Sequence, residues 1–326
     1  MTEKNAIQPG ELKDQLAEIT ETMQRERIEF SPEMKKYFDE TLAKITDKMV
    51  KGQMPVKSEL EVFIKTIKEY IEKEKFLREL EQQYQKRLET GAYFELYDKD
   101  NPVVEGIDGR QYPAPTWDEI KQVITPKHVE KVKKYIKNPM ILVVPIAMPL
   151  EKFAEKVGAK KGKMKKPGKV EKSYELNSDI NGDIVYFPEK YDKTNHGGIT
   201  KPDLLKQKGG FNKFPGWQVL IVDGDDEVQN ETLDKSADDL LEGNKSNGIT
   251  GITPEEFLIM HASGVQEKGK PFNAVTSTWC TSSYFKDFGD VPYSCWDSFD
   301  LKIDFEKGIK GATNTHLGAR RAVRIW

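Results

Sequence analysis

The stretch MILVV at residues 140–144 is the clearest buried-strand pattern in the chain. It is short and apolar, contains three β-branched residues, and is bracketed by Pro139 and Pro145. A short apolar run between chain breakers is typical of a strand buried in a sheet. The run therefore predicts that the middle of the chain contains a sheet.

Helix signals lie on both sides of this strand. The motifs TWDE at residues 116–119 and TPKH at 125–128 each place a threonine N-cap before a helix, and an Asn-Pro pair ends the second helix. Residues 149–157 have a helical pattern, whereas residues 91–115 are rich in turn formers and predict a connector. Helices before and after a buried strand indicate an α/β region.

The N-terminal third, residues 11–88, predicts three helices with one apolar stripe each. Ser31 and Pro32 start the second helix, because serine caps helix N-termini and proline in the first turn gives up no helical hydrogen bond. The tract GQMP at residues 52–55 ends it. The third stripe is formed by Leu60, Phe63, Ile67, Tyr70, Leu77, Tyr84 and Leu88. Such a seam fits packing within a helical hairpin or bundle, and a coiled-coil oligomerisation stalk is the alternative.

Length and composition exclude several classes of protein. The 326 residues include 51 basic and 54 acidic ones, which nearly cancel, so charge does not indicate a nucleic-acid binder. The longest apolar run, residues 140–150, contains two prolines and is too short to cross a bilayer. No signal peptide is evident, and two cysteines are too few for a disulfide framework. We therefore expect a cytoplasmic chain without membrane insertion and without nucleic acid as a partner.

Three polar segments could be interpreted as ligand-binding sites. For each of them we prefer a purely structural interpretation, as a loop or a turn. Seven lysines between residues 160 and 172 lack interleaved arginine or aromatic residues, so they predict a solvated loop instead of a phosphate-binding patch. NSDING at residues 177–182 resembles a calcium loop, but Pro188 stands where the bidentate glutamate belongs, and Asn-Gly favours a β-hairpin. DGDDE at residues 223–227 predicts a solvated acidic loop instead of a metal cluster. We expect neither a metal nor another cofactor.

The sequence contains no familiar catalytic motif. It has no phosphate-binding Gly-x-x-x-x-Gly-Lys, no Gly-x-Ser-x-Gly, no His-Glu-x-x-His and no dinucleotide fingerprint. Cys280 or Cys295 acting with His261 or His316 is the remaining catalytic combination, and it rests on residue types alone. We therefore expect a protein that is not an enzyme, with a cysteine- and histidine-dependent enzyme as the alternative.

The segment at residues 276–299 has an unusual composition. Its 24 residues include eight Ser or Thr and seven aromatic residues. Binding surfaces use this mixture, because Tyr and Trp give rigid contact area and the hydroxyls give adaptable hydrogen bonds. A β-rich core with ordinary aromatic residues is the alternative. The lack of a clean period favours a loop-rich segment held by a scaffold.

Several motifs carry a resemblance to a known group of proteins. They are PGWQVLIV at residues 215–222, TPEEFL at 253–258, VPYSCW at 291–296 and LGARRAVR at 317–324. This layout resembles uncharacterised bacterial proteins that end in a C-type-lectin-like domain, some of which are variable target proteins of diversity-generating retroelements. The ending is also similar to the Gly-Phe-Arg end of formylglycine-generating enzymes. That activity is not implied, because the two cysteines lie fifteen residues apart.

The resemblance implies a division of labour within the C-terminal domain. Gly318, Arg320 and Val323 would belong to the last scaffold strand. The displayed residues that contact the ligand would be Trp279, Ser282, Tyr284, Tyr293, Trp296, Ser298 and Asp300. The ligand implied is a protein or a glycan, since aromatic side chains suit both.

These observations predict an α+β protein in three parts. Residues 1–92 would form a helical bundle or stalk, residues 93–138 a connector with short helices, and residues 139–326 an α+β region that becomes C-type-lectin-like towards its end. The expected function is non-enzymatic ligand binding, with possible homo-oligomerisation through the N-terminal helices. A structural oligomerising protein is a further alternative.

Overall fold

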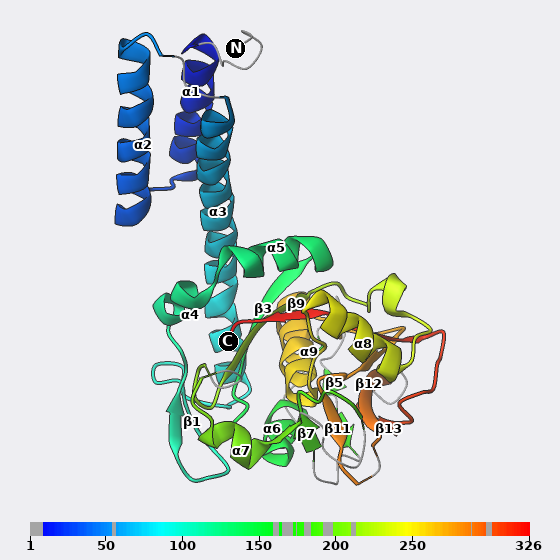
Figure 1. Cartoon of the computed structure of the whole chain (residues 1–326). Helices are drawn as coiled ribbons and strands as arrows, with labels where there is room; N and C mark the ends of the chain where they lie inside the picture. Colours follow the sequence, from blue (N-terminus) through cyan, green and yellow to red (C-terminus); the bar gives the residue numbers. More distant parts are fainter. Residues whose placement is uncertain are drawn as a thin grey trace. The chain divides into compact units, whose positions relative to one another are not determined.

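The computed structural model describes residues 9–53, 57–158, 163–164, 172–173, 175–178, 184–191, 198–209, 213–287, 289–297 and 302–326. The chain divides into two compact units, Met1–Glu79 (unit 1) and Leu80–Trp326 (unit 2). Figure 1 shows the helices of the first unit and the mixed helices and strands of the second. The predicted mixture of a helical N-terminal region and a sheet-rich C-terminal part is confirmed.

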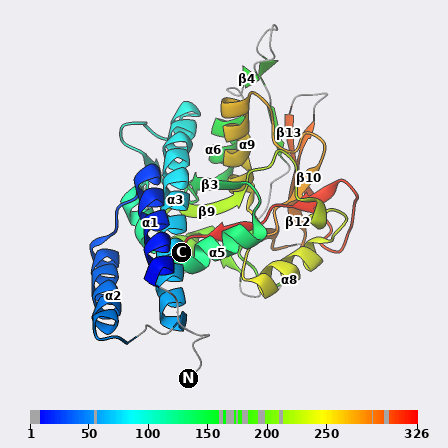
Figure 2. The ribbon, with the colours of Figure 1, turned by 90° about the horizontal axis from the view of Figure 1, so that it is seen from above.

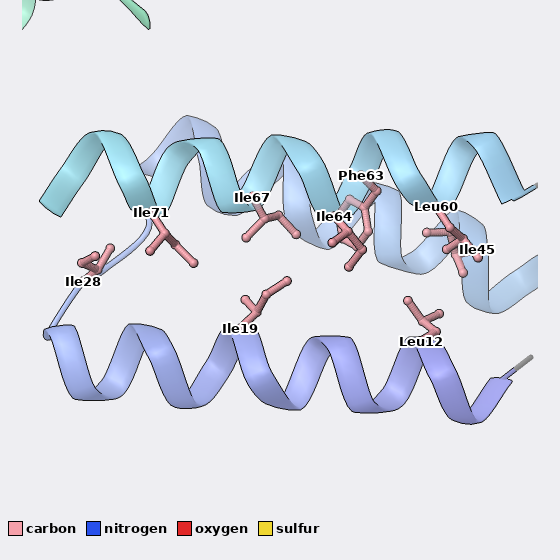
Figure 3. Close-up of a cluster of buried hydrophobic side chains, with 9 residues drawn as sticks. All are labelled: Leu12, Ile19, Ile28, Ile45, Leu60, Phe63, Ile64, Ile67 and Ile71. Carbon is pink, nitrogen blue, oxygen red and sulfur yellow. The ribbon is translucent and has the colours of Figure 1, made fainter. Parts of the chain in front are cut away.

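Unit 1 consists of α1 (Pro9–Glu26), α2 (Pro32–Val50) and the first part of α3 (Lys57–Tyr93). The predicted start of α2 is confirmed, because the Ser31 side chain accepts a hydrogen bond from the Met34 N–H and Pro32 follows it. Apolar side chains from all three helices meet in one cluster (Figure 3). Its buried members are Leu12, Ile19, Ile28, Ile45, Leu60, Phe63, Ile64, Ile67 and Ile71.

Two side chains of α3 fix the turn between α1 and α2. The Tyr70 hydroxyl accepts a hydrogen bond from the Ser31 N–H at 2.8 Å and donates one to the Glu29 carbonyl at 3.0 Å. The Arg78 guanidinium donates to the Arg27 carbonyl at 2.8 Å and so satisfies a carbonyl at the end of α1. The turn is therefore held by side-chain bonds as well as by apolar packing.

The last part of α3 belongs to unit 2, although the apolar seam predicts a boundary near residue 92. The Gln83 side-chain amide donates to the Pro139 carbonyl at 3.1 Å and accepts from the Ile141 N–H at 3.0 Å. Arg87 Nε donates to the Ile141 carbonyl at 3.0 Å. These bonds pair α3 with the free edge of β3 (Pro139–Val144), which explains why the unit boundary lies inside the helix.

The segment between α3 and β3 forms a hairpin and two helices. Strands β1 (Val103–Glu105) and β2 (Gln111–Pro113) pair antiparallel. Helices α4 (Trp117–Val123) and α5 (Pro126–Tyr135) follow, each with a threonine N-cap where the sequence predicts one. The prediction of short helices is therefore confirmed.

A three-stranded antiparallel sheet in the order β15-β9-β3 forms the centre of unit 2. Its other strands are β9 (Gln218–Asp223) and β15 (Ala322–Arg324), and the predicted strand at residues 140–144 is confirmed. Helix α9 (Pro254–Lys268), which is buried from Pro254 to Val265, contacts β3 and lies beside α6 (Leu150–Gly158), as Figure 2 shows.

A second sheet has the order β14-β10-β12-β13-β6. Its strands are β14 (Leu317–Ala319), β10 (Ser277–Trp279), β12 (Val291–Asp297), β13 (Lys302–Gly308) and β6 (Glu175–Ser178). The third sheet joins β11 (Ser283–Phe285), β7 (Ile184–Tyr186) and β8 (Ile199–Thr200). The remaining elements are β4 (Lys163–Met164), β5 (Lys172–Ser173), α7 (Lys201–Lys206), the 3-10 helix Asn230–Thr232 and α8 (Ala237–Asn247).

Two predictions about strands are wrong. The strands on either side of Asn181-Gly182 exist, but β6 pairs with β13 and β7 pairs with β8 and β11, so they do not form a hairpin. The turn itself lies outside the described residues, as does most of the lysine-rich segment. The segment expected to be loop-rich instead forms β10, β11 and β12. Within the described ranges, no helix has both the length and the apolar character needed to span a membrane.

Candidate ligand-binding surface

Most residues expected on display are buried. The exposed fraction is 1% for Trp279, 0% for Tyr284 and 7% for Trp296, and Ser282 is 4% exposed. The expected exposure of these four residues is therefore wrong. Tyr293 is half-buried. Ser298 and Asp300 lie outside the described residues.

Helix α8 covers the part of the second sheet's face that carries Trp279. Trp279 packs in an apolar cluster with Leu240 of α8 and Leu317 of β14. Its ring lies so close to Gly308 that a Cβ there would be 2.3 Å from Trp279 Cζ3. The Tyr293 ring meets it edge-on, with ring centroids 5.5 Å apart. This tryptophan is a core residue because both a helix and the neighbouring strand cover it.

The opposite face of the sheet packs against α9. The Trp296 ring lies 5.3 Å from the His261 ring, and the Phe305 ring meets Phe257 at 5.7 Å. Ser282 is held away from solvent, because its hydroxyl donates to the Gly251 carbonyl at 2.9 Å. The Ser282 hydroxyl is thus used for a hydrogen bond inside the protein and is not displayed to a ligand.

Farther along the face that carries Trp279, on β12 and β13, several side chains remain accessible. Along both strands buried and accessible residues alternate, so Ser294 and Trp296 point inward while Tyr293 and Cys295 point outward. On β13 the outward residues are Asp304 and Glu306. We call Tyr293, Cys295, Asp304 and Glu306 the outer face.

The outer face carries two carboxylates beside a phenol. Tyr293 lies directly opposite Glu306 and donates its hydroxyl hydrogen to Glu306 Oε2, and Cys295 lies opposite Asp304. Burial, followed by the hydrogen bond to Glu306, raises the pKa of Tyr293, so its phenol stays protonated. Asp304 Oδ1 is shielded from solvent and has no hydrogen-bond partner among the described residues. The exposed carboxylate of Glu306 therefore offers acceptor oxygens that an incoming donor can use, whereas Asp304 Oδ1 is out of a ligand's reach.

Arg320 holds the scaffold behind this sheet together. Its fully buried guanidinium donates to the carbonyls of Asp223 at 3.0 Å, Asp225 at 2.6 Å and Asp226 at 3.0 Å, and also to the Asn273 side chain. Burial lowers the pKa of Arg320 to about 10. This value is still well above 7, so the guanidinium stays charged at neutral pH. The loop that provides these carbonyls is the one expected to be a solvated acidic loop.

That expectation is wrong for Asp223, which is 0% exposed and accepts a hydrogen bond from Gln229 at 2.6 Å. Desolvation raises the pKa of Asp223. Gly318 is part of the same interior, because a Cβ there would lie 2.8 Å from Thr232 Oγ1. The resemblance assigns Gly318, Arg320 and Val323 to one last scaffold strand, which is wrong: Gly318 lies in β14, Arg320 directly follows it, and Val323 lies in β15 of another sheet.

A buried ionic cluster at the start of α9 is not apparent from the sequence. Lys201 Nζ lies 2.8 Å from Glu255 Oε1, which also accepts a hydrogen bond from the Tyr186 hydroxyl at 2.7 Å. Glu256 forms a two-point ion pair with Arg324, including a 2.8 Å bond to Nη2. The sequence does not reveal these pairs, because the basic partners Lys201 and Arg324 lie far along the chain from the two glutamates.

The geometry disfavours Cys280 as a catalytic nucleophile. Burial raises the pKa of the Cys280 thiol well above its ordinary value, so the nucleophilic thiolate is suppressed. Burial also lowers the pKa of His261 to about 3, whereas His316 is exposed on the surface. In the described part of the chain, no group of three or more His, Cys, Asp or Glu side chains is placed to hold a metal ion.

Comparison of the chain with protein families, curated proteins and solved structures finds no match. Function is therefore inferred from the residues of this chain.

Proposed function

We propose that this chain is a non-enzymatic ligand-binding protein whose contact surface is the outer face of β12 and β13. The observation that carries the proposal is the alternation along these strands. Side chains that point inward fill the core against α9, while Tyr293, Asp304 and Glu306 point outward with polar groups. A face of this kind is rigid, because the strands beneath it are packed on the other side.

The chemistry of the outer face suits a protein or a glycan. Carboxylate oxygens accept hydrogen bonds from sugar hydroxyls or from the ammonium and guanidinium groups of a protein. Tyr293 adds an aromatic surface with a polar tip, which is a common anchor at interfaces.

The proposal includes a C-type-lectin-like fold for the C-terminal part and a relation to the variable proteins of diversity-generating retroelements. It is supported by the ending LGARRAVR, which forms β14, the buried Arg320 and β15, an outer strand of the central sheet. Diversification would then act on outward positions of β12 and β13 while the buried ending stays constant.

Unit 1 is proposed to associate with a second copy of itself. Several apolar side chains there remain half-buried around the cluster, among them Phe30, Tyr37, Phe38, Leu42 and Met49. Association would cover them further. Light scattering on the full chain tests this, and a strict monomer at high concentration would contradict it.

The binding proposal is tested on the full chain with a glycan microarray and a displayed peptide library. A ligand found in either is then measured against Glu306→Gln and Asp304→Asn, which remove charge while keeping shape. We expect at least about a tenfold loss of affinity with unchanged melting temperature. Glu242→Gln, an exposed glutamate of α8, is the matched control and should bind normally. Specific binding that survives both outer-face substitutions would refute the assigned surface.

A further inference from the structure

Two neighbouring helices, α4 and α5, both begin with a capping box, but the side chain that accepts the hydrogen bond from the N-cap N–H differs between them. In α4 the Thr116 N–H donates to Glu119 Oε2 at 2.7 Å, and the Glu119 N–H donates to Thr116 Oγ1 at 3.3 Å. In α5 the Thr125 N–H donates to His128 Nδ1 at 3.1 Å, and the His128 N–H donates to Thr125 Oγ1 at 3.3 Å. Both are complete capping boxes. An imidazole takes the place of the usual carboxylate in the second.

This replacement makes the α5 cap dependent on proton concentration. An imidazole nitrogen accepts a hydrogen bond only while it carries no proton. Protonation of Nδ1 would place a hydrogen opposite the Thr125 N–H and break the bond. It would also add a positive charge at the helix N-terminus, where the dipole favours negative charge.

The surroundings of the ring oppose a positive charge further. The first turn of α5 contains no acidic residue. Burial lowers the pKa of His128, and Lys131 and Lys127 of the same helix lower it further, whereas a backbone hydrogen bond involving Val123 of α4 acts in the opposite direction. The charged groups that act on the ring are thus both cationic.

The later turns of α5 are held by other contacts. Val129 and Val132 are buried, the Tyr135 hydroxyl donates to Asn247 at 2.8 Å, and the Gln229 amide donates to the Tyr135 carbonyl at 3.0 Å. Lys131 donates to the Gly248 carbonyl. None of these bonds involves the imidazole, so loss of the cap releases the first turn and leaves the rest of the helix attached.

We propose that the first turn of α5 is an acid-sensitive switch. It is closed while His128 accepts the Thr125 amide hydrogen, and it opens locally when the ring is protonated, with the remainder of unit 2 still folded. The opening bares the backbone N–H groups of the first turn next to the α4–α5 connection.

Hydrogen exchange of the full chain at pH 7 and pH 5, corrected for intrinsic rates, tests the switch. We expect protection at residues 125–129 to fall about five- to tenfold on going to pH 5, whereas protection of the neighbouring capped helix α4 at 116–123 stays constant. His128→Glu copies the α4 box, so its α5 protection should be equal at both pH values. His128→Ala lacks the acceptor, so its protection should be low at both.

Three results would overturn the proposal. One is wild-type α5 protection that does not change between the two pH values. Another is an equal loss in His128→Glu, which would place the titrating group elsewhere. The third is a parallel loss in α4, which would show unfolding beyond α5 and no local switch.

Discussion

Replacing the buried histidine of α9 should remove much of the acid sensitivity of unit 2. His261 is 0% exposed and lies between the rings of Phe257 and Trp296. Burial lowers its pKa from the ordinary value of 6.5 to about 3, so the folded protein holds the ring neutral down to low pH. In the unfolded chain the ring has its ordinary pKa, so as the pH falls it binds a proton at a much higher pH than in the folded protein.

The sign and size of the effect follow from this difference. The neutral ring stabilises the fold fully above the ordinary histidine pKa, and the stabilisation is lost as pH falls towards the folded value. Each pH unit inside that window lowers the free energy of unfolding by about 1.4 kcal/mol, so going from pH 7 to pH 5 removes about 2 kcal/mol.

The assay is urea unfolding at pH 7 and pH 5, followed by tryptophan fluorescence. All five tryptophans belong to unit 2, so unfolding of unit 1 does not contribute to the signal. The variants His261→Phe and His261→Gln lack the titrating ring. Their own effect on stability cancels when each protein is compared with itself at the two pH values. The contribution of His128 cancels when the loss in a variant is subtracted from the loss in the wild type, because all three proteins contain it.

We expect the wild type to lose about 2 kcal/mol more than either variant between pH 7 and pH 5. If both variants lose as much stability as the wild type, His261 is not the buried group that titrates on unfolding. The reasoning from its burial would then be incorrect.

Three further predictions concern stability. Arg320→Met leaves three loop carbonyls without their donor and should lower the free energy of unfolding by about 3 kcal/mol or more; a loss under 1 kcal/mol in urea titrations would contradict this. Gly308→Ala forces a Cβ into the neighbouring tryptophan and should cost about 1–3 kcal/mol, whereas Gly311→Ala meets open space and should stay within about 0.5 kcal/mol in the same titrations. Tyr70→Phe removes both bonds to the α1–α2 turn and should destabilise unit 1 by about 1 kcal/mol by far-UV circular dichroism, with exposed Tyr93→Phe as the neutral control.

Local features of the fold are predictable from the sequence because short-range chemistry decides them. Ser31, Thr116 and Thr125 cap the helices that their motifs predict, since a capping side chain reaches only two or three residues along the chain. The strand at residues 140–144 is equally clear because its apolar run is bounded by breakers.

Features that depend on distant partners are not predictable in this way. The Asn181-Gly182 signal favours a hairpin locally, but β6 and β7 find better partners in separate sheets. In β10 and β11 most residues are buried on both faces, so no alternation marks them as strands. Composition also cannot reveal that α8 covers Trp279. For this reason the candidate surface in the structure differs from the expected one. Of the expected aromatic residues, only Tyr293 lies on it.

The pairing of Gln83 with β3 has a consequence for aggregation. An unoccupied strand edge offers its N–H and C=O groups to strands of other molecules, which is a common route to aggregation. The Gln83 amide supplies one donor and one acceptor where a further strand would bind, and Arg87 occupies the next carbonyl. A truncated protein beginning after Tyr93 would keep every strand of the central sheet and lose this blockade. The end of α3 thus protects unit 2 against intermolecular sheet extension.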